Sequence, residues 1–232
     1  MMFTFKQFAI KQQRSAMKVG TDGVLLGSWV EKPALCKHIL DIGTGTGLLA
    51  LMLAQRFHVP VDAVEIDRDA ASEAMENVAN SPFSDYVKVI NSDIRTFVPT
   101  KKYDLIVCNP PFFVGSLRCP DARRSQARHS DNLTPESLLS VAERMLSPNG
   151  WFSLVYPIQE SEAFMKMSDK KGLKCIREMV VYPTYNHAPK RKLITFSFSG
   201  GHFVSESLVI EKERHCYTDE YKVLTKDFYL NF

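Results

Sequence analysis

Hydrophobic and polar positions follow two alternating patterns from residue 38 onward. Short runs rich in β-branched and aromatic residues are separated by stretches with helical periodicity, of which residues 48–57 are apolar on nearly every side. This alternation is typical of a parallel sheet covered by helices. We therefore expect an α/β, doubly wound, mostly parallel sheet. The predicted strands are residues 38–43, 61–67, 87–93, 103–109 and 151–157, and the predicted helices are residues 48–57, 68–80 and 134–146.

The last third of the chain has a different pattern. Residues 173–183, 191–198 and 205–212 each resemble a strand, and little helical periodicity lies between them. Consecutive strands with short connections pair antiparallel. The pattern therefore predicts antiparallel edge strands at the C-terminal side of the sheet.

The first 35 residues hold an alternating stretch at residues 3–10 and a short helical stretch, for which Thr21 or Asp22 is the expected N-cap. This is too little sequence for an independent core. We expect residues 1–35 to be an extension that folds back over the sheet. Residues 36–232 are expected to form one domain, which a chain with 45% hydrophobic residues can support.

A glycine-rich turn, LDIGTGTGLLAL at residues 40–51, follows a predicted strand and opens a predicted helix. Gly43, Gly45 and Gly47 permit a tight turn, close approach of a ligand, and close packing of the helix on the sheet. Dinucleotide-binding enzymes use a related loop, and a glycine turn can also be purely structural. The loop alone therefore leaves the ligand open.

Polar side chains recur where successive predicted strands end. Glu65 follows Gly43 by 22 residues, where an acidic side chain can accept hydrogen bonds from both ribose hydroxyls, and Asp93 ends the next strand. Asp41 and Asn109 reach the same edge. One acid after a strand is about as often a cap or turn former, so the inference depends on the recurrence over four strands. Acids beside the glycines disfavour a pyrophosphate, and cationic S-adenosylmethionine fits better than NAD.

The fourth predicted strand ends in a stiff corner, Asn109-Pro110-Pro111-Phe112. Prolines lack a backbone N–H, which leaves the Pro110 carbonyl free to accept a hydrogen bond beside the Asn109 side chain. An exocyclic amine such as adenine N6 could satisfy both acceptors while Phe112 stacks on its ring. The grip favours a pyramidal nitrogen whose lone pair points at a methyl group. The alternative is a rigid turn with Phe112 or Phe113 in the core.

Basic residues are candidates for binding nucleic acid only where they cluster. A net charge of +3 and an isoelectric point near 8.5 are too mild to indicate nucleic-acid binding. Residues 115–134 form a long predicted loop, and such loops are usually functional or disordered. Basic side chains there could grip phosphates around a flipped base, although a solvated loop without a special role is the alternative. The candidates are Arg118, Arg123, Arg124 and Arg128, together with Lys190 and Arg191.

Several classes of protein are disfavoured. The five cysteines are scattered and never spaced as C-x-x-C, so neither a disulfide framework nor a zinc site is expected. No apolar run approaches the roughly 20 residues of a membrane helix, and the N-terminus lacks the apolar core of a signal peptide. We expect a cytoplasmic protein without a metal and without membrane association.

Residues 41–47 match D-x-G-x-G-x-G, and here the chain resembles the class I S-adenosylmethionine-dependent methyltransferases, which have a Rossmann-like fold. In that class N-P-P-[FY] is the signature of enzymes that act on conjugated nitrogens: adenine N6, cytosine N4 less often, or the glutamine amide. The glutamine group commonly carries a helical N-terminal domain. Only 40 residues precede Asp41, and they do not look like such a helical domain, which favours adenine. A narrower resemblance, to the bacterial tRNA1(Val) adenine-N6 methyltransferase family, rests on residues 17–29, 41–56, 109–113, 127–134 and 217–232.

This resemblance implies RNA modification during tRNA processing, with a methyl group transferred to N6 of the adenosine 3′ to the anticodon of a valine tRNA. N6-methyladenosine is the expected product. The resemblance also implies that the loop 43–47 lies under the cofactor, that Glu65 holds its ribose, and that Asp93 contacts its adenine.

In this family the segment that begins at Lys18 folds over the cofactor, which adds Gly20, Thr21 and Asp22 as secondary cofactor candidates. Phe113 either walls the substrate pocket or anchors the loop that follows. A monomer is expected.

Alternatives remain at this point. The same chemistry could serve ribosomal RNA, DNA or a protein glutamine. A nicotinamide oxidoreductase would explain the glycines and Glu65, but it would give residues 109–112 no function. A non-catalytic RNA-binding module would leave Asn109, Pro110 and Phe112 unexplained.

Overall fold

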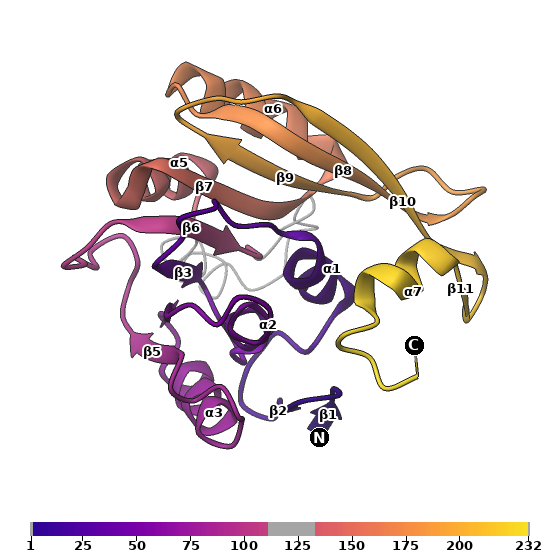
Figure 1. Ribbon diagram of the computed structural model, residues 1–232, viewed down its shortest axis with the longest axis horizontal. Coiled ribbons are helices and arrows are strands. Elements are labelled where there is room, and N and C mark those ends of the chain that lie inside the picture. Colours follow the sequence, from indigo (N-terminus) through magenta and orange to yellow (C-terminus); the bar gives the residue numbers. More distant parts are fainter. Residues whose placement is uncertain (1, 111–132, 232) are drawn as a thin grey trace, which may run out of the picture.

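The computed structural model describes residues 2–110 and 133–231, which form a mixed nine-stranded sheet with helices on both faces and a separate two-stranded sheet (Figure 1). The strand order of the large sheet is β11-β10-β8-β9-β7-β6-β3-β4-β5. The α/β prediction is confirmed. The strands are β1 (Met2–Thr4), β2 (Ala9–Lys11), β3 (Ile39–Ile42), β4 (Val61–Glu65), β5 (Val87–Asn91), β6 (Tyr103–Cys108), β7 (Leu146–Pro157), β8 (Lys174–Thr184), β9 (Arg191–Ser197), β10 (Val204–Glu213) and β11 (Cys216–Tyr217). The helices are α1 (Thr21–Trp29), α2 (Leu48–Phe57), α3 (Arg68–Ala79), α5 (Pro135–Met145), α6 (Ile158–Lys170) and α7 (Asp219–Thr225).

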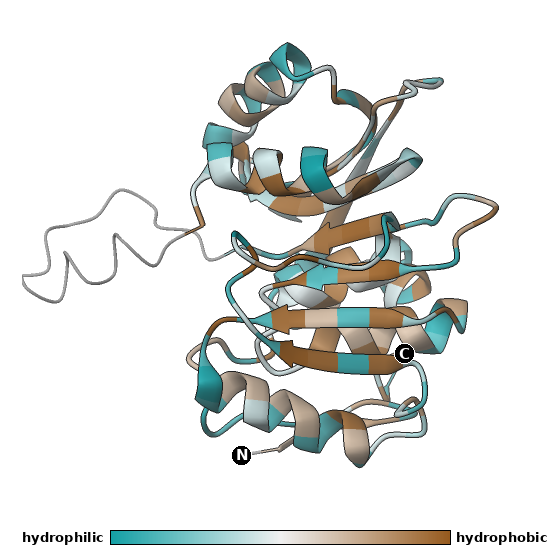
Figure 2. Ribbon diagram, turned by 90° about the vertical axis from the view of Figure 1, so that its left-hand side faces the viewer, coloured by the Kyte–Doolittle hydropathy of each residue, from teal (hydrophilic) through white to brown (hydrophobic). Residues whose placement is uncertain are grey.

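The sheet places hydrophobic side chains on both of its faces, as its alternating strand residues require. One buried cluster includes Val24, Leu51 and Leu105 and is covered by α1, α2 and α7. The other includes Leu139 and Phe164 and is covered by α5 and α6. Figure 2 shows mostly hydrophobic residues in the strands and a mixture of hydrophobic and hydrophilic residues in the helices. The central strands are therefore held rigidly from both sides.

The C-terminal strands differ in one respect from the prediction. β9 is antiparallel to both β7 and β8, as expected, but β10 is parallel to β8. The reason is that both edges of β9 are already paired, so β10 adds to the free edge of β8. Two strands that both run opposite to β9 must run in the same direction. The predicted alternation of strand directions was correct, and the predicted neighbour was wrong.

Helix α6 lies between the predicted strands 151–157 and 173–183, where no element was predicted from the sequence. Its buried positions are Ser161, Phe164 and Ser168, which lie three and four residues apart on one face. Two of these three are serines, each bonding a backbone carbonyl one turn back. The buried stripe is therefore only partly apolar.

The N-terminal residues pack mainly on helices. Phe5, Phe8 and Ile10 are buried in the same cluster as α1 and α2, and the Lys6 backbone N–H donates to the Phe228 carbonyl near the other end of the chain (2.8 Å). The N-cap of α1 is Gly20, in an extended conformation without a side-chain cap hydrogen bond. The expectation of a Thr21 or Asp22 cap was therefore wrong.

Within residues 2–110 and 133–231, no helix is both long and apolar enough to cross a bilayer.

Candidate active site

Three neighbouring parallel strands end at the same level and bring the sequence candidates together. In the register of the sheet, Cys108 of β6 pairs with Ile42 of β3, and Ile42 pairs with Val64 of β4. The next residues, Asn109, Gly43 and Glu65, therefore stand side by side at the carboxyl edge of the sheet. Side chains alternate between faces along a strand, so Asp41, Glu65 and Asn109 all belong to the face covered by α1 and α2. Ligands of open α/β sheets bind at such an edge.

The glycine loop adopts a conformation that only glycine takes easily. Gly43, Gly45 and Gly47 have φ of 69°, 57° and 84°, in the left-handed region. A Cβ on Gly43 would meet nothing within 4 Å, and one on Gly45 would meet only Ser15 Oγ at 3.7 Å. A Cβ on Gly47 would lie 3.4 Å from that of Ala74 in α3. Gly43 and Gly45 thus border open space, whereas Gly47 allows close packing of the loop on α3.

Two buried carboxylates hold the shape of this loop. Asp41 accepts a hydrogen bond from the Thr44 hydroxyl (2.6 Å). Glu65 accepts one from the Gly45 backbone N–H with Oε2 (2.8 Å) and one from the Asp67 backbone N–H with Oε1 (2.9 Å). Glu65 therefore joins the glycine loop to the start of α3, and each oxygen keeps a second lone pair for another donor.

The charge of Asp41 is poorly solvated. Its side chain is 1% exposed, and burial raises the pKa of its carboxyl group from 3.8 to about 7. The Thr44 hydrogen bond opposes this rise in pKa, and the negative charge of Glu65 adds to it. A cation bound nearby would favour the ionised form of Asp41.

Asp93 lies two residues beyond the end of β5, and an arginine holds its carboxylate. Arg95 donates to both carboxylate oxygens through its guanidinium (2.6 to 3.0 Å) and also through its backbone N–H (2.9 Å). The guanidinium bonds are the main reason why the pKa of Asp93 lies below its usual value. A ligand that bonds to Asp93 must share this carboxylate with Arg95.

Asn109 is half-buried and lies next to the first turn of α1. A Cβ on Gly23 would be 3.5 Å from Asn109 Nδ2, an ordinary contact distance, and 3.3 Å from Leu48 Cδ2, so a side chain at position 23 would touch Asn109 and crowd Leu48. Pro110 is buried. The remaining candidates of this corner and of the arginine loop lie outside the described residues: Pro111, Phe112, Phe113, Arg118, Arg123, Arg124 and Arg128.

An ion pair joins a residue predicted to bind the cofactor, Asp22, to a residue predicted to bind RNA, Arg191. Arg191, the first residue of β9, donates from Nε to Asp22 Oδ2 at 2.8 Å. This ion pair connects the first turn of α1 to the start of β9. Lys190 is exposed beside it.

The site suits a cationic ligand without a phosphate group. The space beside Gly43 and Gly45 is bounded by the buried acid Asp41, and Glu65 still has acceptor capacity. S-adenosylmethionine, with its sulfonium and ammonium charges, meets this requirement, and a pyrophosphate would be repelled by the two acids. Among the residues described, no group of three His, Cys, Asp or Glu side chains is arranged to hold a metal ion.

Sequence reasoning missed two residues of this site, Ser15 and Gly23. Ser15 lies against Gly45 and Gly23 lies against Asn109, but in the sequence these partners are separated by 30 and 86 residues. No local motif marks either position. Only the tertiary fold reveals them.

Comparison with known proteins gives a consistent result. The family model described as methyltransferase small domain matches residues 15–170. A protein of Bacteroides fragilis named tRNA1(Val) (adenine(37)-N6)-methyltransferase is 48% identical over 98% of this chain and 97% of its own length. Proteins of Trichodesmium erythraeum and Pectobacterium carotovorum with the same name are 45% and 43% identical, over 99% and 98% of this chain and 98% and 93% of their own lengths.

Solved structures show the same fold at low identity. A "predicted O-methyltransferase" of Agrobacterium tumefaciens has a TM-score of 0.71 at 19% identity and covers 89% of this chain and 96% of its own. A glycopeptide N-methyltransferase solved with S-adenosylmethionine has a TM-score of 0.57 at 14% identity and covers 80% of this chain and 91% of its own.

Proposed function

The chain belongs to the methyltransferase small domain family and, within it, to the tRNA1(Val) (adenine(37)-N6)-methyltransferases; on this basis we propose that it methylates N6 of adenine 37 in tRNA1(Val). The methyl donor is S-adenosylmethionine. The observation that supports this substrate best is the end-to-end relationship to proteins of that name, at 43 to 48% identity. The proposed substrate implies a cytoplasmic enzyme, and we propose that it acts as a monomer without a metal.

In the proposed mechanism Asn109 and Pro110 hold the amine. The Asn109 side-chain oxygen and the Pro110 carbonyl accept its two N–H bonds, which draws the lone pair out of conjugation with the ring. When bound, S-adenosylmethionine supplies an electrophilic methyl group. No general base is needed beforehand, because the nitrogen becomes acidic only after alkylation. Positioning of this kind can contribute about 7 to 11 kcal/mol to the barrier reduction. Pro111 stiffens the corner, and Phe112 stacks on the base.

Cofactor binding is assigned to the glycine loop and its neighbours. Gly43 and Gly45 leave room for the ligand, Asp41 provides the negative potential, and Glu65 holds the ribose with its free lone pairs. Asp93 contacts the adenine while it keeps Arg95. Residues 1–35 cover the site, and Gly20, Thr21 and Asp22 form its rim. The nearness of Ser15 to Gly45 and of Gly23 to Asn109 supports this assignment.

A methylation assay with mass spectrometry of the nucleosides tests the function directly. The purified protein, S-adenosylmethionine and an unmodified tRNA1(Val) transcript are expected to yield N6-methyladenosine. A transcript with guanosine at position 37 is the control and should stay unmethylated. Methyl label that appears in ribosomal RNA, DNA or protein, with none in tRNA1(Val), would contradict the proposal.

The first turn of α1 offers a test of Asn109 that leaves Asn109 itself intact. In Gly23→Ala the new Cβ crowds Leu48 at 3.3 Å and touches Asn109 at 3.5 Å, and kcat is expected to fall about two- to tenfold because the Asn109 side chain adjusts to its new neighbours. The melting temperature should change little, because alanine favours the helix by about 1 kcal/mol and offsets the crowding. Steady-state kinetics and calorimetry measure both quantities.

Gly27→Ala is the matched control, one turn further along the same helix. Its Cβ would lie 2.7 Å from Met52 Sδ, away from the corner. Overpacking of about 1 to 3 kcal/mol should lower the melting temperature, with kcat unchanged at temperatures well below melting. Equal kcat values for the two variants would contradict a role for the α1 contact in positioning Asn109.

RNA binding is assigned to Lys190 and Arg191, and to Phe113, Arg118, Arg123, Arg124 and Arg128 beyond the described residues. Lys190→Ala is expected to raise KM for tRNA about three- to tenfold and to reduce its salt dependence, because one phosphate contact is lost. KM for S-adenosylmethionine should not change. Lys174, at the other end of the β8–β9 pair from Arg191, provides the control as Lys174→Ala. A KM for tRNA that responds equally to both substitutions would remove Lys190 from the interface.

A further inference from the structure

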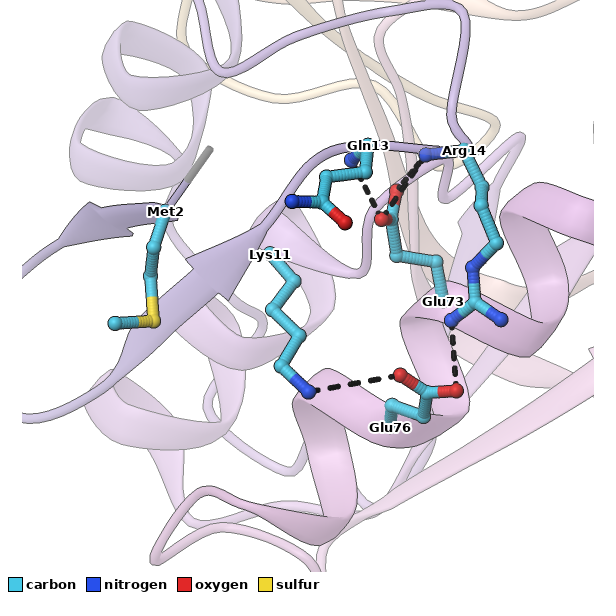
Figure 3. A pocket seen from close by; sticks show the side chains of 6 residues that line it. All are labelled: Met2, Lys11, Gln13, Arg14, Glu73 and Glu76. Carbon is cyan, nitrogen blue, oxygen red and sulfur yellow. Dashed lines mark hydrogen bonds and ion pairs between the residues drawn. The ribbon is translucent and has the colours of Figure 1, made fainter.

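Residues 11–19, here called the strap, run from β2 to α1 along α3. Figure 3 shows the side chains of Lys11 and Arg14 turned toward Glu76, and the backbone nitrogens of Gln13 and Arg14 bonded to Glu73. The two glutamates are three residues apart and differ in their surroundings. Glu73 is 1% exposed, whereas the Glu76 side chain is 45% exposed.

Glu73 bonds the backbone of the strap at three successive residues. Its Oε1 accepts the Gln13 N–H at 2.6 Å and the Arg14 N–H at 3.1 Å, and its Oε2 accepts the Ser15 N–H at 2.9 Å. Burial alone would raise the pKa of Glu73, but these backbone donors outweigh it and hold the pKa below its usual value. The carboxylate therefore stays ionised and fixes the path of the strap.

Asn77, one turn further along α3, joins the strap to the glycine loop. It is 2% exposed; its Oδ1 accepts the Lys11 N–H at 2.8 Å. Its Nδ2 donates to the Lys11 carbonyl and to the Thr46 carbonyl, each at 2.9 Å. One amide thus holds the beginning of the strap and the glycine loop together.

The strap is also closed on itself, and it ends against the glycines. The Gln12 side chain accepts the Val19 N–H at 2.7 Å, and Lys18 Nζ donates to the Ser15 carbonyl at 3.2 Å. Ser15 is the last of the three residues that bond Glu73. Its hydroxyl oxygen would lie 3.7 Å from a Cβ atom added to Gly45. The strap therefore forms one wall of the open space beside the glycine loop.

A buried carboxylate is an expensive way to attach a chain segment, because apolar packing can give equal or greater stability without desolvating a charge. What the carboxylate adds is a single conformation for three consecutive residues. We propose that Glu73 and Asn77 are positioning residues for the cofactor, which act through the strap by holding Ser15 against the glycine loop. This inference rests on the proposed function in one respect, namely that S-adenosylmethionine binds at that loop.

Glu73→Gln is the main test. The amide would place an N–H₂ group against at least one of the strap N–H groups, so at least one hydrogen bond is lost and the wall loosens. Kd for S-adenosylmethionine, measured by calorimetry, is expected to rise about tenfold. Because the amine grip at Asn109 is untouched, kcat at saturating S-adenosylmethionine should stay within about threefold.

Glu76→Gln is the matched control on the same helix and the same strap. Glu76 pairs with Arg14 at 2.8 Å and with Lys11 at 3.7 Å, and exposed pairs of this kind contribute little. The Kd of Glu76→Gln for S-adenosylmethionine should stay within about twofold of the wild-type value. An unchanged Kd in folded Glu73→Gln, or equal changes in both variants, would overturn the proposal.

A measurement on the wild type covers the case in which Glu73→Gln does not fold. Hydrogen exchange at the amides of Gln13, Arg14 and Ser15 should slow when S-adenosylmethionine is added, because the ligand closes the space beside the strap. Unchanged exchange at saturating ligand would overturn the proposal. A wild-type protein that binds S-adenosylmethionine but does not methylate tRNA1(Val) would contradict only the proposed substrate. The role of Glu73 would still be decided by the Kd values of the wild type, Glu73→Gln and Glu76→Gln for S-adenosylmethionine.

Discussion

Replacing Asn109 by alanine is expected to lower kcat for tRNA methylation about a hundred- to a thousandfold, while Kd for S-adenosylmethionine changes less than about threefold. Asn109 stands level with Gly43 at the carboxyl edge, on a strand buried from both sides, so its acceptor is placed without reorganisation. The substitution removes one of the two acceptors that we propose to hold the amine, and it leaves the glycine loop intact. Single-turnover kinetics and calorimetry separate the two effects.

Asn80→Ala provides the control for this prediction. Asn80 is exposed at the end of α3, where its Nδ2 donates to the Glu76 carbonyl. Its removal should affect the stability of the helix end slightly and leave kcat unchanged. Normal turnover by Asn109→Ala would rule out the proposed mechanism, and an equal loss of cofactor binding would assign Asn109 to the cofactor instead.

Replacing Asp41 by asparagine is expected to weaken S-adenosylmethionine binding on the order of a hundredfold while it stabilises the free protein. The side chain keeps its shape and an acceptor for the Thr44 hydroxyl, so the change isolates the charge. A buried negative charge near the sulfonium of a ligand whose net charge is +1 contributes more than it would in water. Loss of binding in a protein that melts at a higher temperature would distinguish this variant from one that is simply misfolded.

The stability gain should depend on pH in a defined direction. The pKa of Asp41 is about 7 in the folded protein and about 3.9 in an unfolded chain. Between these values the folded state holds a proton that the unfolded state releases, so the free energy of unfolding falls as the pH rises from about 4 to about 7. The full loss is on the order of 4 kcal/mol. Asp41→Asn avoids it, and its melting temperature should exceed that of the wild type by several degrees at pH 8 and by less at pH 5.

Cofactor binding should show the opposite trend in the wild type. A cationic ligand favours ionised Asp41, so affinity is expected to increase as the pH rises toward about 7, with release of a proton on binding. Calorimetry in buffers of different ionisation enthalpy measures this proton. Asp62→Asn is the control, since Asp62 pairs with Lys101 near the other end of β4 and its loss should leave affinity unchanged. Affinity in Asp41→Asn equal to that of the wild type would remove Asp41 from the cofactor site.

Much of the fold follows from local patterns. Helix α2 has the bounds that the sequence predicted, and the strands β3 to β6 lie within one or two residues of theirs. These elements are long or strongly apolar, and their periodicity is a local property. Helix α6, whose buried positions include two serines, was not predicted. The parallel pairing of β10 was not predicted either, because strand order depends on which edges are already occupied.

The sequence by itself determined the chemistry of the candidate site: the glycine loop, the acids at the strand ends, and the Asn109-Pro110 corner. These are residue types next to predicted elements, and short motifs carry them. Only the tertiary structure decided which residues support them. Ser15 and Glu73 meet across 58 positions, and Asp22 and Arg191 meet across 169. Such contacts depend on strand register and helix packing over the whole domain, and no local pattern encodes them.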